Sequence, residues 1–440
     1  MIVERVRAID PDGRESARDV RVGDGDERVD GRGLVALPGL IDLHAHLREP
    51  GFEDSETVAT GARAALRGGF TAVCAMANTV PAQDAPGLIA ELAARGRDAR
   101  AARVLPVAAV TRGRNGKELA DLVELASAGA VAFSDDGDPV DDAHVFRMAL
   151  EYACAAGRPI LEHPQDRELS GRGVMHEGRV SADLGLPGIP AAAEESAVAR
   201  DLAVARLTGG RLHLQHVSTA GAVALVRAAK AEGLHVTCEA TPHHLAMTDA
   251  WVGGSRAFVW ERRRGASPPP TPRAVAYDSA TKVNPPLRSE ADVRALWAGL
   301  ADGTIDAIAT DHAPHASFRK DVEYAEAAFG ISGLDTALSV LLAAVEAGMG
   351  DIATVVRALA AGPARVLGIA PFADDVVLVD PAAEWEVTPA ALASKGKNTP
   401  LLGRRLRGRV VAAVVDGEVR YRDEAALKGR GRATEAIARR

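Results

Sequence analysis

The stretch GLIDLHAHLREPG, residues 39–51, places two histidines two positions apart at the end of an apolar run, followed by an arginine. Successive side chains of a strand point to opposite faces, so His44 and His46 would lie on the same face. Two neutral imidazoles on one face are half of the ligand set of a typical zinc site. The pair alone is ambiguous, because histidines that only satisfy hydrogen bonds at a strand end would show the same spacing.

Further metal-binding side chains recur at the ends of other apolar runs. They are Asp135 and Asp136 in AFSDDGD, His163 in PILEH, His216 in LHLQH, and Asp311, His312 and His315 in DAIATDHAPH. If these runs are parallel strands, four histidines and two aspartates from five strands converge at one edge. Such a set favours a pair of borderline divalent cations, with zinc as the best match.

Two cations need a bridging anion from the protein. Lys117 is the only lysine before His163, and it lies near a predicted helix start instead of a strand end. A bridge made from a modified lysine is therefore not expected. The SDDG pair, Asp135 and Asp136, supplies a carboxylate instead, and the spacing leaves open which of the two it is.

Other polar residues near these runs have simpler interpretations. His213 is out of phase with His216 on the same strand and is expected to pack outward. His243 and His244 in TPHHL follow a strand, so they are expected to be structural, with a supporting role beside the metal ligands as the alternative. Asp42 shares a face with His44 and is expected either to orient an imidazole or to cap a turn.

The elements that must position these residues form an alternating pattern. From about Pro38, short apolar runs alternate with Ala-, Leu- and Arg-rich stretches of helical periodicity. Eight such runs precede residue 315, which indicates an α/β fold with a closed (β/α)8 barrel, whose reactive groups lie at the carboxyl ends of the strands. A doubly wound open sheet is the alternative. It is disfavoured because no GxGxxG phosphate-binding turn is present.

Both ends of the chain show the short alternating patterns of β-strands. We therefore predict residues 1–37 and 368–440 to form one small β-sandwich beside a barrel domain of residues 38–367. Residues 252–276, rich in Pro, Gly and Arg, are expected to be a long surface excursion. The charged tail from about Ala425 is expected to be frayed.

Composition excludes several classes of function. The net charge of −8 argues against nucleic acid as the main partner. The three cysteines have no CxxC spacing, which fits a reducing compartment. Neither an N-terminal signal peptide nor an apolar run long enough to span a bilayer is apparent, so we expect a soluble cytoplasmic protein that does not act at a membrane.

A series of motifs then resembles one known family. PGLIDLHAHLREPG, AMANT, AFSDDG, HVST, VNPPLR, TDHAPH and SKGKNTPLLG occur in the order and near the spacing of the class I dihydroorotases of the amidohydrolase superfamily. The likeness runs from about Pro38 to Arg420 and is highly specific when the motifs are taken together. Two departures are modest: Ala77 stands where the family usually has proline, and EHPQD replaces the commoner EHCED.

The resemblance implies a (β/α)8 barrel with a small β-sandwich from both termini, and a role for each matching residue. His44, His46 and Asp311 would hold a first zinc ion, His163 and His216 a second, and Asp136 would bridge them. Asp311 would also be the catalytic acid and base. The substrate would be bound by His46 and by residues at the other matching positions, the last two through their backbone: Arg48, Asn78, Asn284, His315, Phe329 and Gly330.

The implied activity is the zinc-dependent, reversible cyclisation of N-carbamoyl-L-aspartate to L-dihydroorotate in pyrimidine biosynthesis. Further partners suggested by the resemblance are a second copy of the chain and aspartate carbamoyltransferase. Two alternatives remain. A hydantoinase or allantoinase would be expected to have the fourth-strand lysine that this chain lacks, and an inactive scaffold for aspartate carbamoyltransferase would be expected to lack metal histidines.

Overall fold

The computed structural model describes residues 1–23, 25–26, 28–263 and 273–428, and its centre is an eight-stranded parallel barrel. Neighbouring strands pair in chain order. The barrel is closed between its first strand and the segment after its last strand. Ala45 and His312 form a parallel bridge there, and the His46 N–H donates to the His312 carbonyl at 2.8 Å. The strands are β5 (Leu40–Ala45), β6 (Phe70–Ala75), β7 (Arg103–Ala108), β8 (Ala132–Phe133), β9 (Ile160–Glu162), β12 (Leu212–Leu214), β13 (Val236–Ala240) and β14 (Ala307–Ile308).

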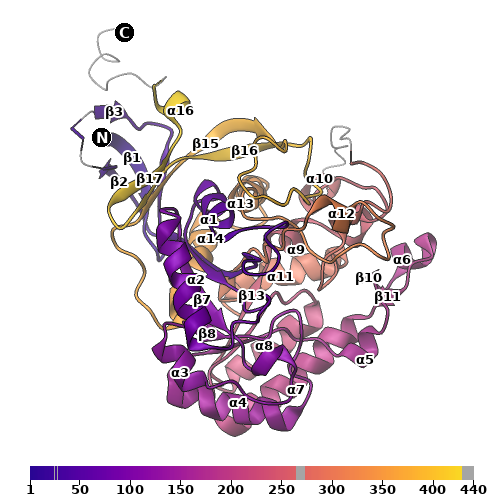
Figure 1. Cartoon of the computed structure of the whole chain (residues 1–440). Helices are drawn as coiled ribbons and strands as arrows, with labels where there is room; N and C mark the ends of the chain where they lie inside the picture. Colours follow the sequence, from indigo (N-terminus) through magenta and orange to yellow (C-terminus); the bar gives the residue numbers. More distant parts are fainter. Residues whose placement is uncertain (24, 27, 264–272, 429–440) are drawn as a thin grey trace.

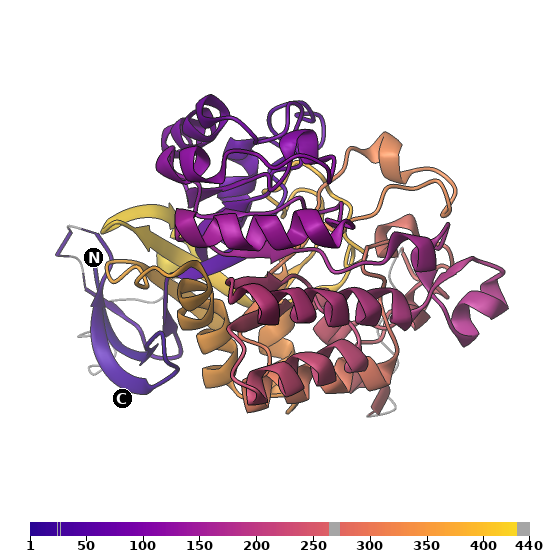
Figure 2. The ribbon, with the colours of Figure 1, turned by 90° about the horizontal axis from the view of Figure 1, so that it is seen from below.

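Helices surround the barrel (Figure 1), and Figure 2 shows α4, α7 and α8 side by side along it. Side-chain caps fix several of their first turns: Thr57 caps α1, and Thr219 caps α8 by accepting from the Ala222 N–H. None of the described helices is both long and apolar enough to cross a bilayer. The main helices are α1 (Val58–Arg67), α2 (Pro86–Asp98), α3 (Leu122–Ser127), α4 (Ala143–Ala156), α7 (Ala191–Thr208), α8 (Ala220–Ala231), α11 (Glu290–Asp302), α13 (Ala337–Glu346), α14 (Ile352–Leu359) and α15 (Ala361–Leu367).

Shorter elements interrupt this pattern where the chain passes over the carboxyl ends of the strands. A two-stranded parallel ribbon lies between β9 and α7. One short helix precedes it, a second connects its two strands, and further short helices follow β13 and β14. These elements are α5 (Arg167–Ser170), β10 (Met175–His176), α6 (Arg179–Leu184), β11 (Gly188–Ile189), α9 (Pro242–Ala246), α10 (Val259–Arg263) and α12 (Ser317–Lys320).

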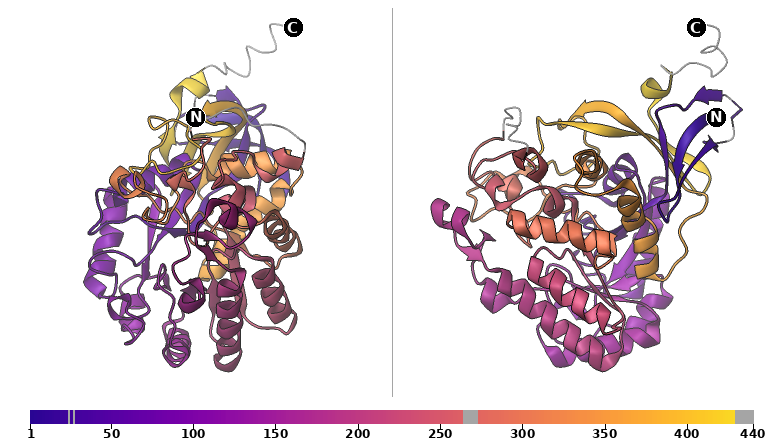
Figure 3. Two further views of the ribbon diagram at one scale, coloured as in Figure 1. Left: turned by 90° about the vertical axis from the view of Figure 1, so that its right-hand side faces the viewer. Right: turned by 180° about the vertical axis from the view of Figure 1, so that it is seen from behind.

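The two ends of the chain form one mixed sheet beside the barrel, as Figure 3 shows. Its central junction is an antiparallel pairing of β4 with β15, in which Leu37 faces Val377. The α/β fold with a barrel and a small β unit built from both termini is thereby confirmed. The strands are β1 (Ile2–Ile9), β2 (Glu15–Arg21), β3 (Arg28–Asp30), β4 (Val35–Pro38), β15 (Val376–Glu386), β16 (Arg405–Val415) and β17 (Glu418–Arg422), and α16 (Glu424–Lys428) follows them.

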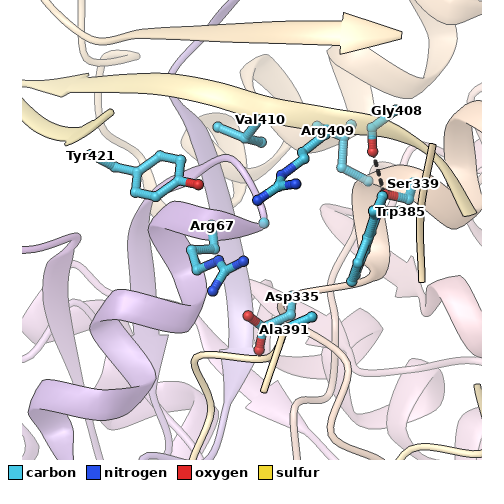
Figure 4. A pocket seen from close by; sticks show the side chains of 11 residues that line it. Arg67, Asp335, Ser339, Trp385, Ala391, Gly408, Arg409, Val410 and Tyr421 are labelled. Carbon is cyan, nitrogen blue, oxygen red and sulfur yellow. Dashed lines mark hydrogen bonds between the residues drawn. The ribbon is translucent and has the colours of Figure 1, made fainter. Parts of the chain in front are cut away.

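The terminal sheet is joined to the barrel helices by specific polar contacts (Figure 4). The Ser339 hydroxyl of α13 donates to the Gly408 carbonyl of β16 at 2.6 Å, and the Trp385 indole N–H donates to the same hydroxyl at 3.2 Å. Arg67, at the end of α1, and Tyr421 of β17 border this junction from the other side. The contacts hold the sheet against the barrel, away from the carboxyl ends of its strands.

The prediction of a surface excursion at 252–276 is wrong for its first half. Phe258 is buried and lies beneath the Arg404 guanidinium, 3.9 Å from its ring centre, while Arg256 is buried against Asp278 with 2.8 Å between Nη2 and Oδ2. Residues 273–276 are at the surface. Residues 264–272, and residues 429–440 of the predicted frayed tail, lie outside the described residues.

Candidate active site and metal centre

A cavity of about 210 Å³ opens where the carboxyl ends of the barrel strands meet. Eleven of the twelve predicted site residues line it, and the twelfth, His44, is fully buried beside Asp136. The sequence separates these residues by up to 286 positions, so the barrel alone brings them together. The eleven are His46, Arg48, Asn78, Asp136, His163, His216, Asn284, Asp311, His315, Phe329 and Gly330.

Asp136, which follows the fourth barrel strand, lies between two pairs of histidines. Its Oδ2 is 3.1 Å from His44 Nε2 and 3.3 Å from His46 Nε2. Its Oδ1 is 3.4 Å from both His163 Nδ1 and His216 Nε2. Each carboxylate oxygen thus faces one pair of imidazoles, which is the arrangement that a ligand bridging two cations requires.

Asp311, after the eighth strand, adds a second carboxylate beside the first pair. Its Oδ1 lies 3.2 Å from His46 Nε2 and 3.6 Å from His44 Nε2. Burial opposes ionisation, but the hydrogen bond with His46 and the charges of the surrounding imidazoles hold the pKa of Asp311 well below its usual range. The pKa of Asp136 is lowered in the same way: burial opposes ionisation, but the charge of His44 and the nearby imidazoles of His163 and His216 outweigh it.

The polar atoms at this site fit divalent cations. Two groups of ligand atoms, one with His44, His46 and Asp136 and the other with Asp136, His163 and His216, each lie within 4.8 Å of one another. His44 Nε2 and Asp136 Oδ1 are buried and have no hydrogen-bond partner among the described residues. Buried polar atoms normally have a partner, and a borderline cation is the partner that imidazole and carboxylate prefer.

Three polar side chains fix the tautomers of the histidines. The Nδ1–H of His46 donates to Asn78 Oδ1 at 2.8 Å, and the Nε2–H of His163 donates to Gln165 Oε1 at 2.8 Å. His44 Nδ1 lies 3.1 Å from Glu239 Oε1. A proton on these nitrogens would leave the other ring nitrogen of His44, His46 and His163, which faces Asp136, free to bind a metal ion.

Asp135 has a different environment from its neighbour. Its Oδ1 accepts from the backbone N–H groups of Val110 and Thr111 at 2.8 and 3.1 Å, and Oδ2 accepts from the Thr111 hydroxyl. Burial raises the pKa of Asp135 to about 6. Asp135 therefore anchors the chain after β7, and the geometry leaves Asp136 as the carboxylate that faces the histidines.

Arg48, His315 and Asn284 line the same cavity as the two carboxylates. Arg48 Nε donates to the Pro314 carbonyl at 3.2 Å, and burial lowers the pKa of Arg48 only to about 10, so it stays charged at neutral pH. Burial and the Arg48 charge lower the pKa of His315 to about 3, so its ring is neutral, and its Nε2–H donates to the Phe329 carbonyl at 2.8 Å. Asn284 Nδ2 donates to Gln165 Oε1 at 2.8 Å.

The backbone is strained where these groups are displayed. Arg48, His216 and Asp311 have φ angles of 62°, 34° and 45°, in the left-handed region that side chains other than glycine seldom adopt. Such strain concentrates at functional sites, where surrounding structure holds it in place. Here it occurs in two proposed metal ligands and in Arg48.

Comparison with known proteins agrees with this geometry. Residues 33–222 match the family model described as Dihydro-orotase-like. A dihydroorotase of Anaeromyxobacter dehalogenans (strain 2CP-1) is 50% identical over 447 residues, which cover 97% of this chain and 99% of that protein. One of Pelotomaculum thermopropionicum is 50% identical over 406 residues, covering 91% and 90%. The chain belongs to the dihydroorotase family.

Solved structures show the same fold at lower identity. An L-hydantoinase (dihydropyrimidinase) from Arthrobacter aurescens superposes with a TM-score of 0.77 at 23% identity, covering 95% of each chain. A dihydropyrimidinase from Brevibacillus agri gives 0.76 at 20% identity, covering 96% of this chain and 95% of that one. The predicted dihydroorotase family is confirmed by sequence, and these structures support the barrel fold alone.

The prediction for His213 is wrong, and one of the two interpretations of Asp42 is not observed. His213 does not pack outward: its Nε2 lies 3.0 Å from Glu239 Oε2, so it belongs to a buried hydrogen-bonded chain that leads to His44. Asp42 orients no imidazole. Its Oδ1 accepts from the backbone N–H groups of Thr310 at 2.8 Å and His44 at 3.3 Å, and thereby fixes the residue before Asp311.

Sequence reasoning also missed three residues that orient this site. Glu239 and Gln165 hold the rings of metal-facing histidines, as described above. Arg114 donates to the carbonyls of Asp135 and Asp136 at 3.1 and 2.8 Å and so fixes the SDDG turn. A charged residue inside an apolar run, as in VTCEA, was the one available signal, and it pointed to Glu239.

Proposed function

We propose that the protein catalyses the reversible interconversion of N-carbamoyl-L-aspartate and L-dihydroorotate, the ring-closing step of pyrimidine biosynthesis. The observation that carries this proposal is the cavity at the strand ends, which Asp136, Asp311 and three of the metal-facing histidines line together with the half-buried Arg48. Ring opening of L-dihydroorotate, followed by ultraviolet absorbance, tests it. Turnover of 5-substituted hydantoins faster than of dihydroorotate would favour the hydantoinase alternative instead.

Two zinc ions per chain are the metals that we propose for this site. His44, His46 and Asp311 would hold the first ion and His163 and His216 the second, with Asp136 between them, because these are the groups within ligand distance of one another. Bound in this way, a pair of divalent cations polarises a carbonyl group and lowers the pKa of a water molecule. No lysine follows the fourth strand, so the carboxylate of Asp136 would take the place of a modified lysine between the two ions.

Asp311 is the residue that we propose to move the proton. Its carboxylate is ionised at neutral pH and lines the cavity beside His46, so it can accept a proton from the attacking water. A cyclic amide nitrogen is a poor leaving group unless it is protonated. Asp311 would then donate the proton to that nitrogen as the C–N bond breaks, and the reverse transfers would accompany ring closure.

Arg48 is proposed to bind the substrate carboxylate, with Asn78, Asn284 and His315 completing the contact. A planar guanidinium can pair with a carboxylate through two parallel hydrogen bonds. Asn78 and Asn284 already hold His46 and Gln165 through one polar atom each, which fixes their side chains beside the cavity. The clamp would hold the ring in one orientation towards Asp311.

Replacing Arg48 with methionine is expected to weaken substrate binding more than turnover. A charge-assisted hydrogen bond contributes about 1.5–3 kcal/mol, so the KM for dihydroorotate should rise about ten- to hundredfold. Steady-state kinetics of Arg48→Met and of the wild type check this. An unchanged KM would contradict the carboxylate clamp.

The location and the macromolecular partners stay predictions. A cytoplasmic location, a homodimer and an association with aspartate carbamoyltransferase are carried forward from the family resemblance as proposals. So are the domain boundaries at residues 37/38 and 367/368.

A further inference from the structure

Lys320 is a buried cation at the end of α12 that the mechanism above does not use. Only 4% of its surface is exposed, and it forms no salt bridge within the described part of the chain. Its Nζ instead donates to three backbone carbonyls: Ala328 at 2.7 Å, Gly330 at 3.1 Å and Lys282 at 3.3 Å. An ammonium group has three N–H donors, so every one of them is satisfied by main-chain oxygen.

Burying a charged ammonium group without a carboxylate partner costs desolvation free energy, so its presence here suggests a specific role. Burial, and next the charge of neighbouring Lys282, lowers the pKa of Lys320 to about 7. An apolar side chain at this position would avoid the desolvation cost of a charge, but it would leave carbonyl groups unpaired. The lysine is thus suited to one task, which is to hold the backbone of residues 328–330 in a fixed position.

Other contacts restrain the same three residues, which we call the 328–330 loop. The Phe329 carbonyl accepts from His315, and the Gly330 carbonyl also accepts from Asn398 Nδ2 at 2.9 Å. The N–H groups of Ala328 and Gly330 donate to the carbonyls of Arg319 and Lys282 at 3.0 and 2.8 Å. Gly330 cannot be replaced, because its φ is 142° and a Cβ would lie 2.6 Å from the Ala313 oxygen.

One backbone N–H group of the 328–330 loop forms no hydrogen bond within the described part of the chain. Among the described residues, the Phe329 N–H has no hydrogen-bond partner, whereas all three carbonyls and both other N–H groups of the loop have one. Phe329 and Gly330 line the cavity beside His315. The unpaired N–H is therefore available to an acceptor oxygen on a bound ligand.

We propose that Lys320 is a positioning residue that fixes the Phe329 N–H as the backbone donor to a ring carbonyl oxygen of the substrate. This inference rests on the proposed function, since the ligand is taken to be dihydroorotate. The backbone contact of Phe329 with the substrate is implied by the family resemblance, and the new element is the role of Lys320 in holding that backbone. Substrates that lack a carbonyl at that position would lose this contact.

Lys320→Met tests the role of the ammonium group, with Lys117→Met as the matched control because Lys117 is exposed and does not line the cavity. We expect Lys320→Met to raise the KM for L-dihydroorotate at least tenfold while kcat changes less than threefold. Lys117→Met should leave both values unchanged. A folded Lys320→Met protein whose KM stays within twofold of the wild-type value would overturn the proposal.

Amide hydrogen exchange gives a second readout that does not depend on the variant folding. In the wild-type protein, an equilibrium mixture of L-dihydroorotate and N-carbamoyl-L-aspartate should slow exchange of one further amide in peptides covering residues 326–332. No slowing in these peptides would overturn the proposal. The wild-type rate is measured first: a protein inactive on dihydroorotate would refute the proposed function, whereas an active protein without this protection would refute only the role of Lys320 and Phe329.

Discussion

Replacing Asp311 with asparagine is expected to reduce kcat for dihydroorotate ring opening by at least about 10³-fold, within the range lost with a general acid–base. An amide has the shape of the carboxylate, but it can neither accept the proton from water nor deliver it to the ring nitrogen. The Oδ1 contacts with His46 and His44 are compatible with asparagine, so the fold should persist. Steady-state rates, thermal melting and bound metal measured together check this.

Asp306→Asn is the matched control for that variant. Asp306 lies immediately before β14, at the opposite end of the strand from Asp311, where it pairs with Lys230 at 2.6 Å. Loss of that pair should affect stability slightly and leave kcat unchanged. If Asp311→Asn retains its metal and turns over at a near-wild-type rate, Asp311 is not the group that moves the proton.

Asp136→Asn is expected to have an effect of similar size for a different reason. The substitution removes the negative charge placed between four imidazoles, so at least one bound cation should be lost. Loss of several kcal/mol of electrostatic stabilisation corresponds to a fall of about 10³-fold or more in kcat. Elemental analysis of the purified variant, with a rate measurement on the same sample, checks both results.

Asp135→Asn discriminates between the two aspartates that sequence spacing left open. An asparagine Oδ1 can still accept from the N–H groups of Val110 and Thr111, and its Nδ2 can donate to the Thr111 hydroxyl. Metal content and kcat should therefore remain within a few-fold of the wild-type values. Metal loss in Asp135→Asn with full metal retention in Asp136→Asn would reverse the assignment.

The metal-facing residues could be predicted from sequence because each one lies in or directly after an apolar run. A closed parallel barrel brings all such positions to one end. The prediction therefore did not require knowing which residues are neighbours in space; this holds for His44, His163, His216 and Asp311. The same argument covered the barrel and the two terminal β segments, whose alternating patterns are local. The distinction between Asp135 and Asp136 was not local, because it depends on the Thr111 contacts.

The residues that orient the site could not be predicted in this way. Glu239 contacts both His213 and His44. The contact with His213 depends on the register in which β12 pairs with β13, which a local sequence pattern does not give. The composition of 252–276 was similarly misleading. Phe258 is buried because Arg404, 146 positions later, covers it, and no pattern within the segment signals a partner that distant.

The most direct test of the whole account is zinc stoichiometry measured against activity. The full chain would be stripped with a chelator, shown by elemental analysis to hold no detectable metal, and then titrated with zinc while dihydroorotate ring opening is followed. We predict that the stripped protein is inactive and that activity rises to a plateau as two zinc ions bind per chain. A metal-free protein that opens the ring at the full rate would contradict the account.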